Sequence, residues 1–296
     1  MSSYRFSPVI KQGWVRAILL LFAFIACSVM VSLITGSIMG ISPFASKNTV
    51  TNEQLLNIAI TSLLINAIAA IALTVTFRRI IDRKPAKSLG LQWTSFEADA
   101  SIGFCLGAAI LGAASLLLFA TGNLEWIDAH FIGQDLLLGL LLMVLIALTE
   151  EIVFRGYILN NLMESMNKWA ALAVSAVMFA LAHSSNPGIS SVAMANLMLA
   201  GMLLGINFIY TRNIWFAVLF HFGWNFIQGP VLGYTVSGLP LKGVLQPALK
   251  GPWWLTGGGF GLEGSFITTC LFALALLLLY IAYERNVAAK MIKASQ

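Results

Sequence analysis

Charged and cysteine residues are both scarce in this sequence. Of 296 residues, 17 are Lys or Arg and 12 are Asp or Glu, about 10% in total, whereas soluble globular domains carry about 25%. So few charges cannot cover a water-facing surface, which excludes a soluble enzyme and a disordered chain. There are only three cysteines, and none has a C-x-x-C partner, which excludes a disulfide scaffold and a cysteine metal cluster.

Long apolar runs are abundant instead. Hydrophobic residues make up 59% of the chain, the mean hydropathy is +0.87, and runs of about 20 apolar residues recur, as in helical membrane proteins. We therefore predict an all-α, polytopic transmembrane helical bundle that forms a single integral membrane domain over residues 1–296. Eight spans are expected: Trp14–Gly40, Leu55–Phe77, Ala100–Thr121, Asp135–Gly156, Trp169–His183, Ile189–Ile209, Ile214–Gln228 and Ser265–Tyr283.

The distribution of basic residues predicts the orientation. With eight spans, 14 of the 17 Lys and Arg residues fall on the side that carries both termini, and only Lys47, Lys242 and Lys250 fall on the other. Cytoplasmic loops are the ones enriched in Lys and Arg, so both termini are expected in the cytoplasm. The same rule explains the net charge of +5 without a nucleic-acid partner.

Two glycine pairs and one long loop indicate how the helices pack. Gly103 and Gly107, and likewise Gly201 and Gly205, form G-x-x-x-G motifs, which let two helices approach closely. The segment Gly229–Gly264 is rich in Gly and Pro. We interpret it as a flexible outer loop, either a plain connector or a lid.

Several ionisable residues lie inside predicted spans. A charge at the centre of a membrane helix costs roughly 2.5–3.5 kcal/mol, so such residues are functional candidates. Glu150 and Glu151 lie in the fourth predicted span, and His183 and His221 lie in the fifth and seventh.

Helical spacing assigns these residues to faces. Glu151 and Arg155 are four residues apart and are expected to pair, while Glu150 is rotated about 100° away. His221 and Asn225 are also four apart, so they present an imidazole and an amide on one face. Carboxylate, imidazole and amide groups from three helices are thus placed to converge in a bundle core.

Each of these features also has a structural interpretation. The Glu151–Arg155 pair is then a packing clamp, His183 a core histidine, and His221 with Asn225 an interhelical hydrogen-bonding pair. Taken together and in this order, these features favour a site.

The combined pattern resembles a known family, the CPBP intramembrane proteases, also described as CAAX proteases and bacteriocin-processing (Abi) proteins. Its three motifs correspond to Glu150-Glu151-x-x-x-Arg155, Phe179-x-x-x-His183 and His221-x-x-x-Asn225. The resemblance covers residues 136–227, which we take as the catalytic core, about a third of the chain.

The resemblance implies an intramembrane endopeptidase that acts on a membrane-associated protein or peptide from within a lipid bilayer, as a multi-pass protein of the bacterial cytoplasmic membrane. It further implies that Glu150 activates a water molecule with His183, that Glu151 and Arg155 position the site, and that His221 and Asn225 stabilise the oxyanion. No cofactor is expected. The alternative is zinc, held by Glu150, His183 and His221, although the spacing is not H-E-x-x-H.

Two other function classes stay open. The chain is alternatively a non-catalytic membrane scaffold, or a bacteriocin immunity or tolerance protein of the same family. A proton-coupled transporter also explains buried acids, but it does not require His221 and Asn225, and no pair of broken helices is evident.

One geometric difficulty follows from these spans. If the fourth helix ends at Gly156 and the fifth begins at Trp169, Glu150 and His183 lie at different depths. The two meet if the fourth helix continues past Gly156, or if the fifth begins outside the bilayer near Met163. We expect the second arrangement, because residues 159–169 are amphipathic.

Overall fold

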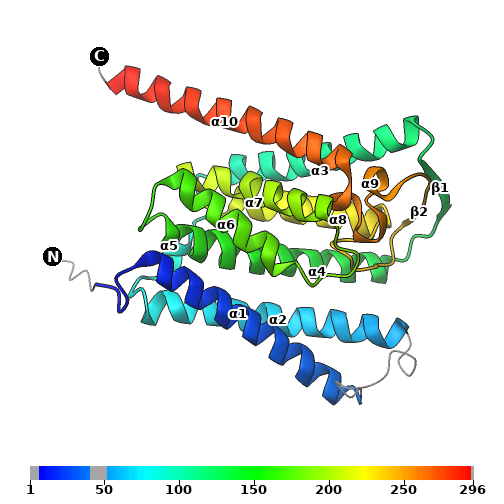
Figure 1. Ribbon diagram of the computed structural model, residues 1–296, viewed down its shortest axis with the longest axis horizontal. Helices are drawn as coiled ribbons and strands as arrows, with labels where there is room; N and C mark the ends of the chain where they lie inside the picture. Colours follow the sequence, from blue (N-terminus) through cyan, green and yellow to red (C-terminus); the bar gives the residue numbers. More distant parts are fainter. Residues whose placement is uncertain (1–6, 41–51, 295–296) are drawn as a thin grey trace.

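A computed structural model describes residues 7–40 and 52–294. Most of this part of the chain is helical, and the helices run alongside one another as a bundle (Figure 1). The order of the elements is α1 (Gly13–Ile38), α2 (Asn52–Ile80), η2 (Ala86–Leu89), α3 (Glu97–Ala120), β1 (Leu124–Ala129), α4 (Gly133–Glu151), η3 (Ile152–Leu159), α5 (Asn160–Leu162), α6 (Lys168–Ala182), α7 (Ser191–Thr211), α8 (Trp215–Phe226), η4 (Ile227–Val231), β2 (Leu245–Leu249), α9 (Trp253–Thr256), η5 (Gly258–Phe260), η6 (Leu262–Gly264) and α10 (Phe266–Ala294).

Within the described residues, six helices are long and apolar enough to cross a membrane: Gly13–Ile38, Ile60–Ile80, Glu97–Ala120, Gly133–Leu162, Ser191–Thr211 and Phe266–Ala289. They correspond to six of the eight predicted spans, so the polytopic helical fold is confirmed. The other two predicted spans correspond to α6, with 15 residues, and α8, with 12. Both are shorter than the roughly 20 residues of a full crossing, so the count of eight stays a prediction.

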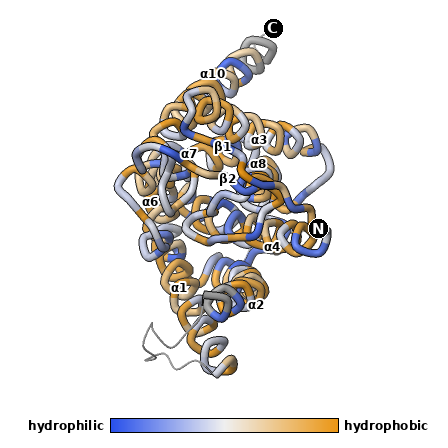
Figure 2. The backbone as a smooth tube through the Cα atoms, turned by 90° about the vertical axis from the view of Figure 1, so that its right-hand side faces the viewer, coloured by the Kyte–Doolittle hydropathy of each residue, from blue (hydrophilic) through white to orange (hydrophobic). Residues whose placement is uncertain are grey.

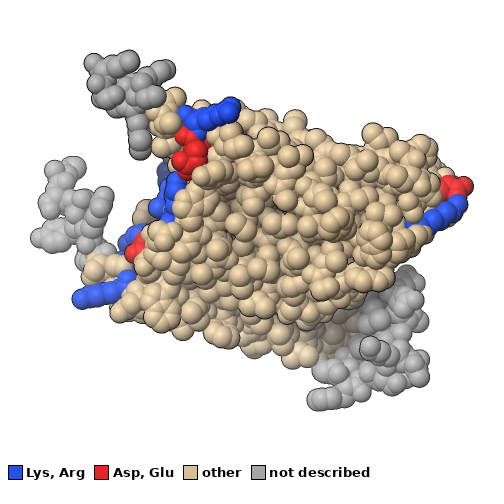
Figure 3. Space-filling view, turned by 45° about the horizontal axis from the view of Figure 1, so that its top comes forward, with Lys and Arg blue, Asp and Glu red and all other residues tan. Residues whose placement is uncertain are grey.

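The polar and apolar regions are arranged as a bilayer requires. The tube in Figure 2 is mostly hydrophobic along the helices, including their outer sides. Figure 3 shows charged side chains at two opposite ends of the molecule with an uncharged band between them. The start of α1 and the end of α10 lie at the same end (Figure 1). That this end is cytoplasmic stays a prediction, and Arg5 and Lys47 lie outside the described residues.

The described residues also form a small sheet, which the all-α prediction does not include. Two short strands, β1 and β2, pair antiparallel, with Leu124 opposite Leu249 and Ala129 opposite Leu245. They tie the connection after α3 to residues 229–264, which we call the outer segment. Because the outer segment also carries α9, η5 and η6, it is not the unstructured loop that its composition predicts.

The glycine pairs act as the sequence predicts, at close helix contacts. A Cβ atom on Gly103 would lie 2.2 Å from the carbonyl oxygen of Phe216, and one on Gly107 would lie 2.7 Å from that of Phe220. A Cβ on Gly201 would lie 2.7 Å from the Cα of Ala176. These distances are too short for any side chain, so glycine lets α3 pack on α8 and α7 pack on α6.

The helix that carries Glu150 continues past Gly156, which corrects our expectation that the next helix begins near Met163. After α4, the chain forms a π-helical segment, η3, and continues through α5 to Leu162. The next helix, α6, begins only at Lys168, because the side chain of Asn167 accepts hydrogen bonds from the first-turn N–H groups of residues 169 and 170.

This continuation explains how Glu150 and His183 come to lie at the same depth in the bundle. From Glu150 to Leu162 the helix advances about 18 Å, and α6 returns about 22 Å before it ends. His183, the residue after α6, therefore arrives at the level of Glu150. A π-helical segment beside a cluster of ionisable residues is common at functional sites.

Candidate active site

The first motif places an ion pair inside the bundle. Arg155 donates from Nη1 to Glu151 Oε1 over 3.0 Å, and from Nη2 to the carbonyl oxygen of Gly201 over 3.1 Å. The side chains of Glu151 and Arg155 are 0% and 1% exposed. Each neutralises the charge of the other, and the bond to Gly201 fixes the guanidinium against α7.

Glu150 points to a different partner, as its rotation on the helix predicts. Its Oε2 lies 3.5 Å from Nε2 of His183, and the two side chains are 21% and 13% exposed. The Nδ1 of His183 lies 2.8 Å from the carbonyl oxygen of Phe179. A carbonyl only accepts, so Nδ1 carries the proton and donates. In the neutral ring, Nε2 is then an acceptor that faces the carboxyl of Glu150.

The third motif is joined to the first. His221 Nδ1 lies 2.8 Å from Glu151 Oε1, the same oxygen that accepts from Arg155. Because an ionised carboxylate only accepts, Nδ1 of His221 is the donor and Nε2 is left for a ligand. Asn225 is 5% exposed, and within the described residues its side-chain amide has no hydrogen-bond partner.

Phe179, a residue of the second motif, lies beside residues of all three motifs. Its ring centroid lies 4.6 Å from the guanidinium carbon of Arg155, 4.6 Å from the ring of His183 and 6.4 Å from that of His221. Phe179 is 3% exposed. One buried ring therefore sets the spacing between the two histidines and shields the ion pair from water.

A cavity of about 40 Å³ lies beside the two histidines. This volume accommodates ordered water molecules. Its polar lining includes three of the predicted residues, and other parts of the chain complete it. The lining residues are Phe179, His183, Asn196, Leu197, Ala200, Leu204, Phe220, His221, Trp224, Asn225, Ser237, Glu263 and Phe272.

The alternative zinc site does not form in this arrangement. Among residues 7–40 and 52–294, no group of three or more His, Cys, Asp or Glu side chains is placed to hold a metal ion. The predicted set of Glu150, His183 and His221 is therefore not placed to share a metal ion as it stands. The metal-free reaction stays a prediction.

Glu263 is a cavity residue that the sequence does not reveal. It lies in η6 and is 7% exposed. Burial raises the pKa of its carboxyl group, although hydrogen bonds from Gln228 and Ser237 oppose this shift. It belongs to none of the three motifs, and its position beside the histidines results from the long-range folding of the outer segment.

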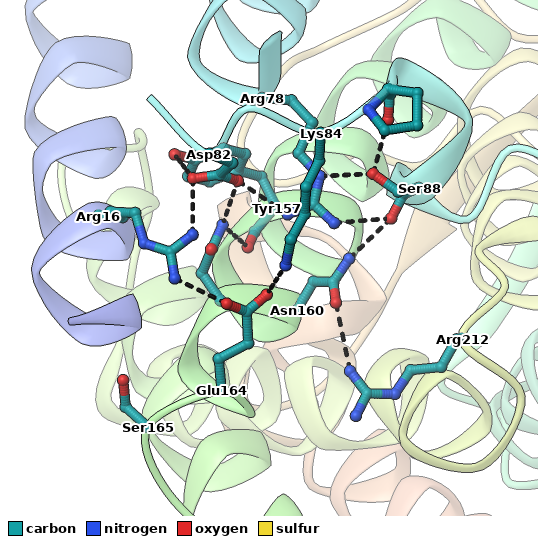
Figure 4. Close-up of polar contacts among 12 residues, drawn as sticks. Arg16, Arg78, Asp82, Lys84, Ser88, Tyr157, Asn160, Glu164, Ser165 and Arg212 are labelled. Carbon is teal, nitrogen blue, oxygen red and sulfur yellow. Dashed lines mark hydrogen bonds and ion pairs between the residues drawn. The ribbon is translucent and has the colours of Figure 1, made fainter. Parts of the chain in front are cut away.

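A second cluster of charged residues lies at the end of the bundle where α1 begins (Figure 4). The sequence alone does not predict this cluster. Asp82 Oδ1 accepts from Arg16 and from the hydroxyl of Tyr157, and Oδ2 accepts from Arg78 and Asn161. The Asp82 side chain is 0% exposed. From the sequence, Arg16 and Arg78 are only two of the 14 basic residues that predict the orientation in the membrane. The four-residue spacing of Arg78 and Asp82 is the one signal in the sequence that indicates a pair.

Part of the chain is similar to a known protein family. Residues 132–227, about a third of the chain, match the model of a family described as type II CAAX prenyl endopeptidase, Rce1-like. This range contains the three motifs and coincides closely with the predicted core of residues 136–227. A search of curated proteins finds no match.

Proposed function

Residues 132–227 belong to the type II CAAX prenyl endopeptidase family, and on that premise we propose that this chain hydrolyses a peptide bond of a membrane-associated protein, in or near a bilayer. The observation that carries the proposal is the cavity. It brings His183, His221 and Asn225 together beside the carboxyl of Glu150, 3.5 Å from His183. A bilayer excludes water, so hydrolysis there requires such a polar recess.

Glu150 is the proposed general base. A water molecule held between its carboxylate and Nε2 of His183 loses a proton to Glu150 while its oxygen attacks the scissile carbonyl carbon. The bond from Nδ1 of His183 to Phe179 fixes the ring so that Nε2 accepts from the same water. The proton then passes from Glu150 to the leaving amine as the peptide bond breaks.

Asn225 and His221 are the proposed donors to the oxyanion that forms during the attack. The amide of Asn225 donates at any pH, and no side chain of the described protein competes for it. His221 donates from Nε2 in the form in which both ring nitrogens carry protons, and its Nδ1 is held 2.8 Å from Glu151 Oε1. Arg155 holds that carboxylate in place.

Comparing the termini of membrane proteins between two strains tests this proposal. One strain carries the wild-type chain and the other carries Glu150→Gln at the same expression level. We expect new termini in the wild-type strain only, and their sequences identify the substrates, including any prenylated Cys-a-a-X tail. Identical termini, with the wild-type phenotype retained by Glu150→Gln, would instead indicate the scaffold or immunity function.

We also propose that the reaction requires no metal ion. The purified protein is expected to keep its full cleavage rate in phenanthroline, because Glu150 and His183 activate the water without a metal. An inactive metal analogue of the chelator is the control for direct inhibition. Loss of activity that zinc restores would overturn the metal-free mechanism.

A further inference from the structure

The outer segment forms one wall of the cavity. Ser237 and Glu263 lie opposite the histidines and belong to residues 229–264, which follow the matched family region. The carbonyl of Ser237 accepts from Asn186, three residues after His183, so this wall is attached directly to the helix end that carries the second motif.

Glu263 is the only ionisable residue that this wall contributes to the cavity lining. Its Oε2 accepts from Gln228 Nε2 over 2.6 Å and from the backbone N–H of Ser237 over 3.2 Å. Its Oε1 accepts from the hydroxyl of Ser237 over 3.1 Å. A carboxylate has about four acceptor positions, so one position on Oε1 is left within the described structure.

Much of the cavity lining is apolar, and Asn196, a polar lining residue, donates to the backbone carbonyl of Glu263. Leu197, Leu204, Phe220 and Phe272 line the same cavity, and the last two are each 2% exposed. A side chain that enters this space meets hydrocarbon walls along its stem and one carboxyl group at its tip. Lysine has this combination of an apolar stem and a strongly donating end.

We propose that Glu263 is a specificity-determining residue, which accepts a hydrogen bond from the donating tip of one substrate side chain, with lysine preferred, while the scissile bond lies at Glu150 and His183. This proposal rests on the proposed endopeptidase function. Because Glu263 is held by Gln228 and Ser237, its oxygen is already positioned before the substrate binds.

A peptide library measures this preference. The purified full-length protein, in lipid nanodiscs, is incubated with a peptide mixture of known sequences, and mass spectrometry identifies each cleaved bond. For the wild type we expect one position near the bond to favour lysine over norleucine, its uncharged analogue, by about 10- to 100-fold, as for a hydrogen bond to a charged group. Glu263→Gln is expected to bring this ratio close to one.

Two further variants separate recognition from a structural role. Ser237→Ala removes one hydrogen bond to Glu263 but keeps the carboxylate, and Glu263→Asp keeps the charge on a shorter stem. Both are expected to retain a preference for lysine. If Glu263→Gln does not fold, as judged by its thermal unfolding, the lysine-to-norleucine ratio of the wild-type protein still tests the proposal.

The outcomes distinguish this inference from the proposed function. Cleavage by the wild type with equal rates for lysine and norleucine at every position, or an unchanged ratio in folded Glu263→Gln, overturns the role of Glu263 and leaves the endopeptidase intact. The absence of any cleaved peptide, with wild type and Glu150→Gln alike, overturns the endopeptidase function itself.

Discussion

Two buried clusters of charge in this protein differ in how their carboxylates are satisfied. At the end of the bundle, all four acceptor positions of Asp82 are used, by Arg16, Tyr157, Arg78 and Asn161. In the candidate active site, Oε2 of Glu150 and Oε2 of Glu151 are buried without a hydrogen-bond partner among the described residues.

The difference indicates what each cluster does. A carboxylate whose acceptor positions are all filled by protein donors has no capacity for water or substrate, so the Asp82 cluster fastens α1 and α2 to the end of the helix that carries Glu150. A buried carboxylate oxygen without a hydrogen-bond partner costs free energy, and in the candidate active site it has the capacity to accept from a water molecule or a substrate. We therefore expect stability to depend on the first cluster and chemistry on the second.

The largest expected effect on stability is that of Asp82→Asn. The substitution leaves Arg16 and Arg78 buried beside a neutral amide, and breaking a buried ion pair in this way costs about 3–5 kcal/mol of unfolding free energy. Thermal unfolding of the purified protein measures the change. The matched control is Glu125→Gln in the exposed Glu125–Lys250 pair, for which we expect no measurable change.

Asn225→Ala is expected to have the opposite profile. Removing one oxyanion donor lowers the cleavage rate constant about 10²- to 10³-fold, or about 2.7–4 kcal/mol of transition-state stabilisation. Thermal unfolding is expected to stay near the wild-type midpoint, because the amide has no partner in the described structure to lose. A variant that unfolds early but cleaves normally while folded would reverse the roles of the two clusters.

A smaller effect is expected from acid at Glu164, on the edge of the first cluster. Burial would raise the pKa of this carboxyl, but hydrogen bonds from Lys84 and Arg16 outweigh it, and its pKa is lowered. A lowered folded-state pKa means that the stabilisation is present above the unfolded-state value of about 4.3 and is lost as the pH falls through the folded-state value.

Because the Glu164 side chain is 30% exposed, we expect this contribution to be about 1 kcal/mol or less. The difference in unfolding free energy between wild type and Glu164→Gln, measured from pH 7 down to pH 3, reports it. A difference that grows toward low pH would contradict the assignment.

The sequence predicts most of the fold because hydropathy and length determine a membrane helix locally. It does not predict the break between α6 and the preceding helix, since the end at Leu162 depends on packing and the start at Lys168 on the cap of Asn167. The strands are missed for a related reason. Each is short, and their pairing joins residues more than 100 positions apart.

The same distinction applies to the site. Helical spacing predicts the contact between Glu151 and Arg155, and the motif resemblance predicts that His183 and His221 lie beside the two glutamates. No local pattern predicts that His221 binds Glu151 itself or that Glu263 lines the cavity. His221 and Glu151 are 70 residues apart, and Glu263 is 35 residues from Gln228, separations for which one sequence contains no periodic signal.

The most direct test of the central claim is one paired measurement on purified Glu150→Gln, the cleavage rate and the thermal unfolding midpoint. The substitution removes the carboxylate that accepts the proton of the water in the proposed mechanism, so we predict that cleavage falls about 10²- to 10⁴-fold while the midpoint stays at the wild-type value. Cleavage at the wild-type rate by the folded variant would contradict the account.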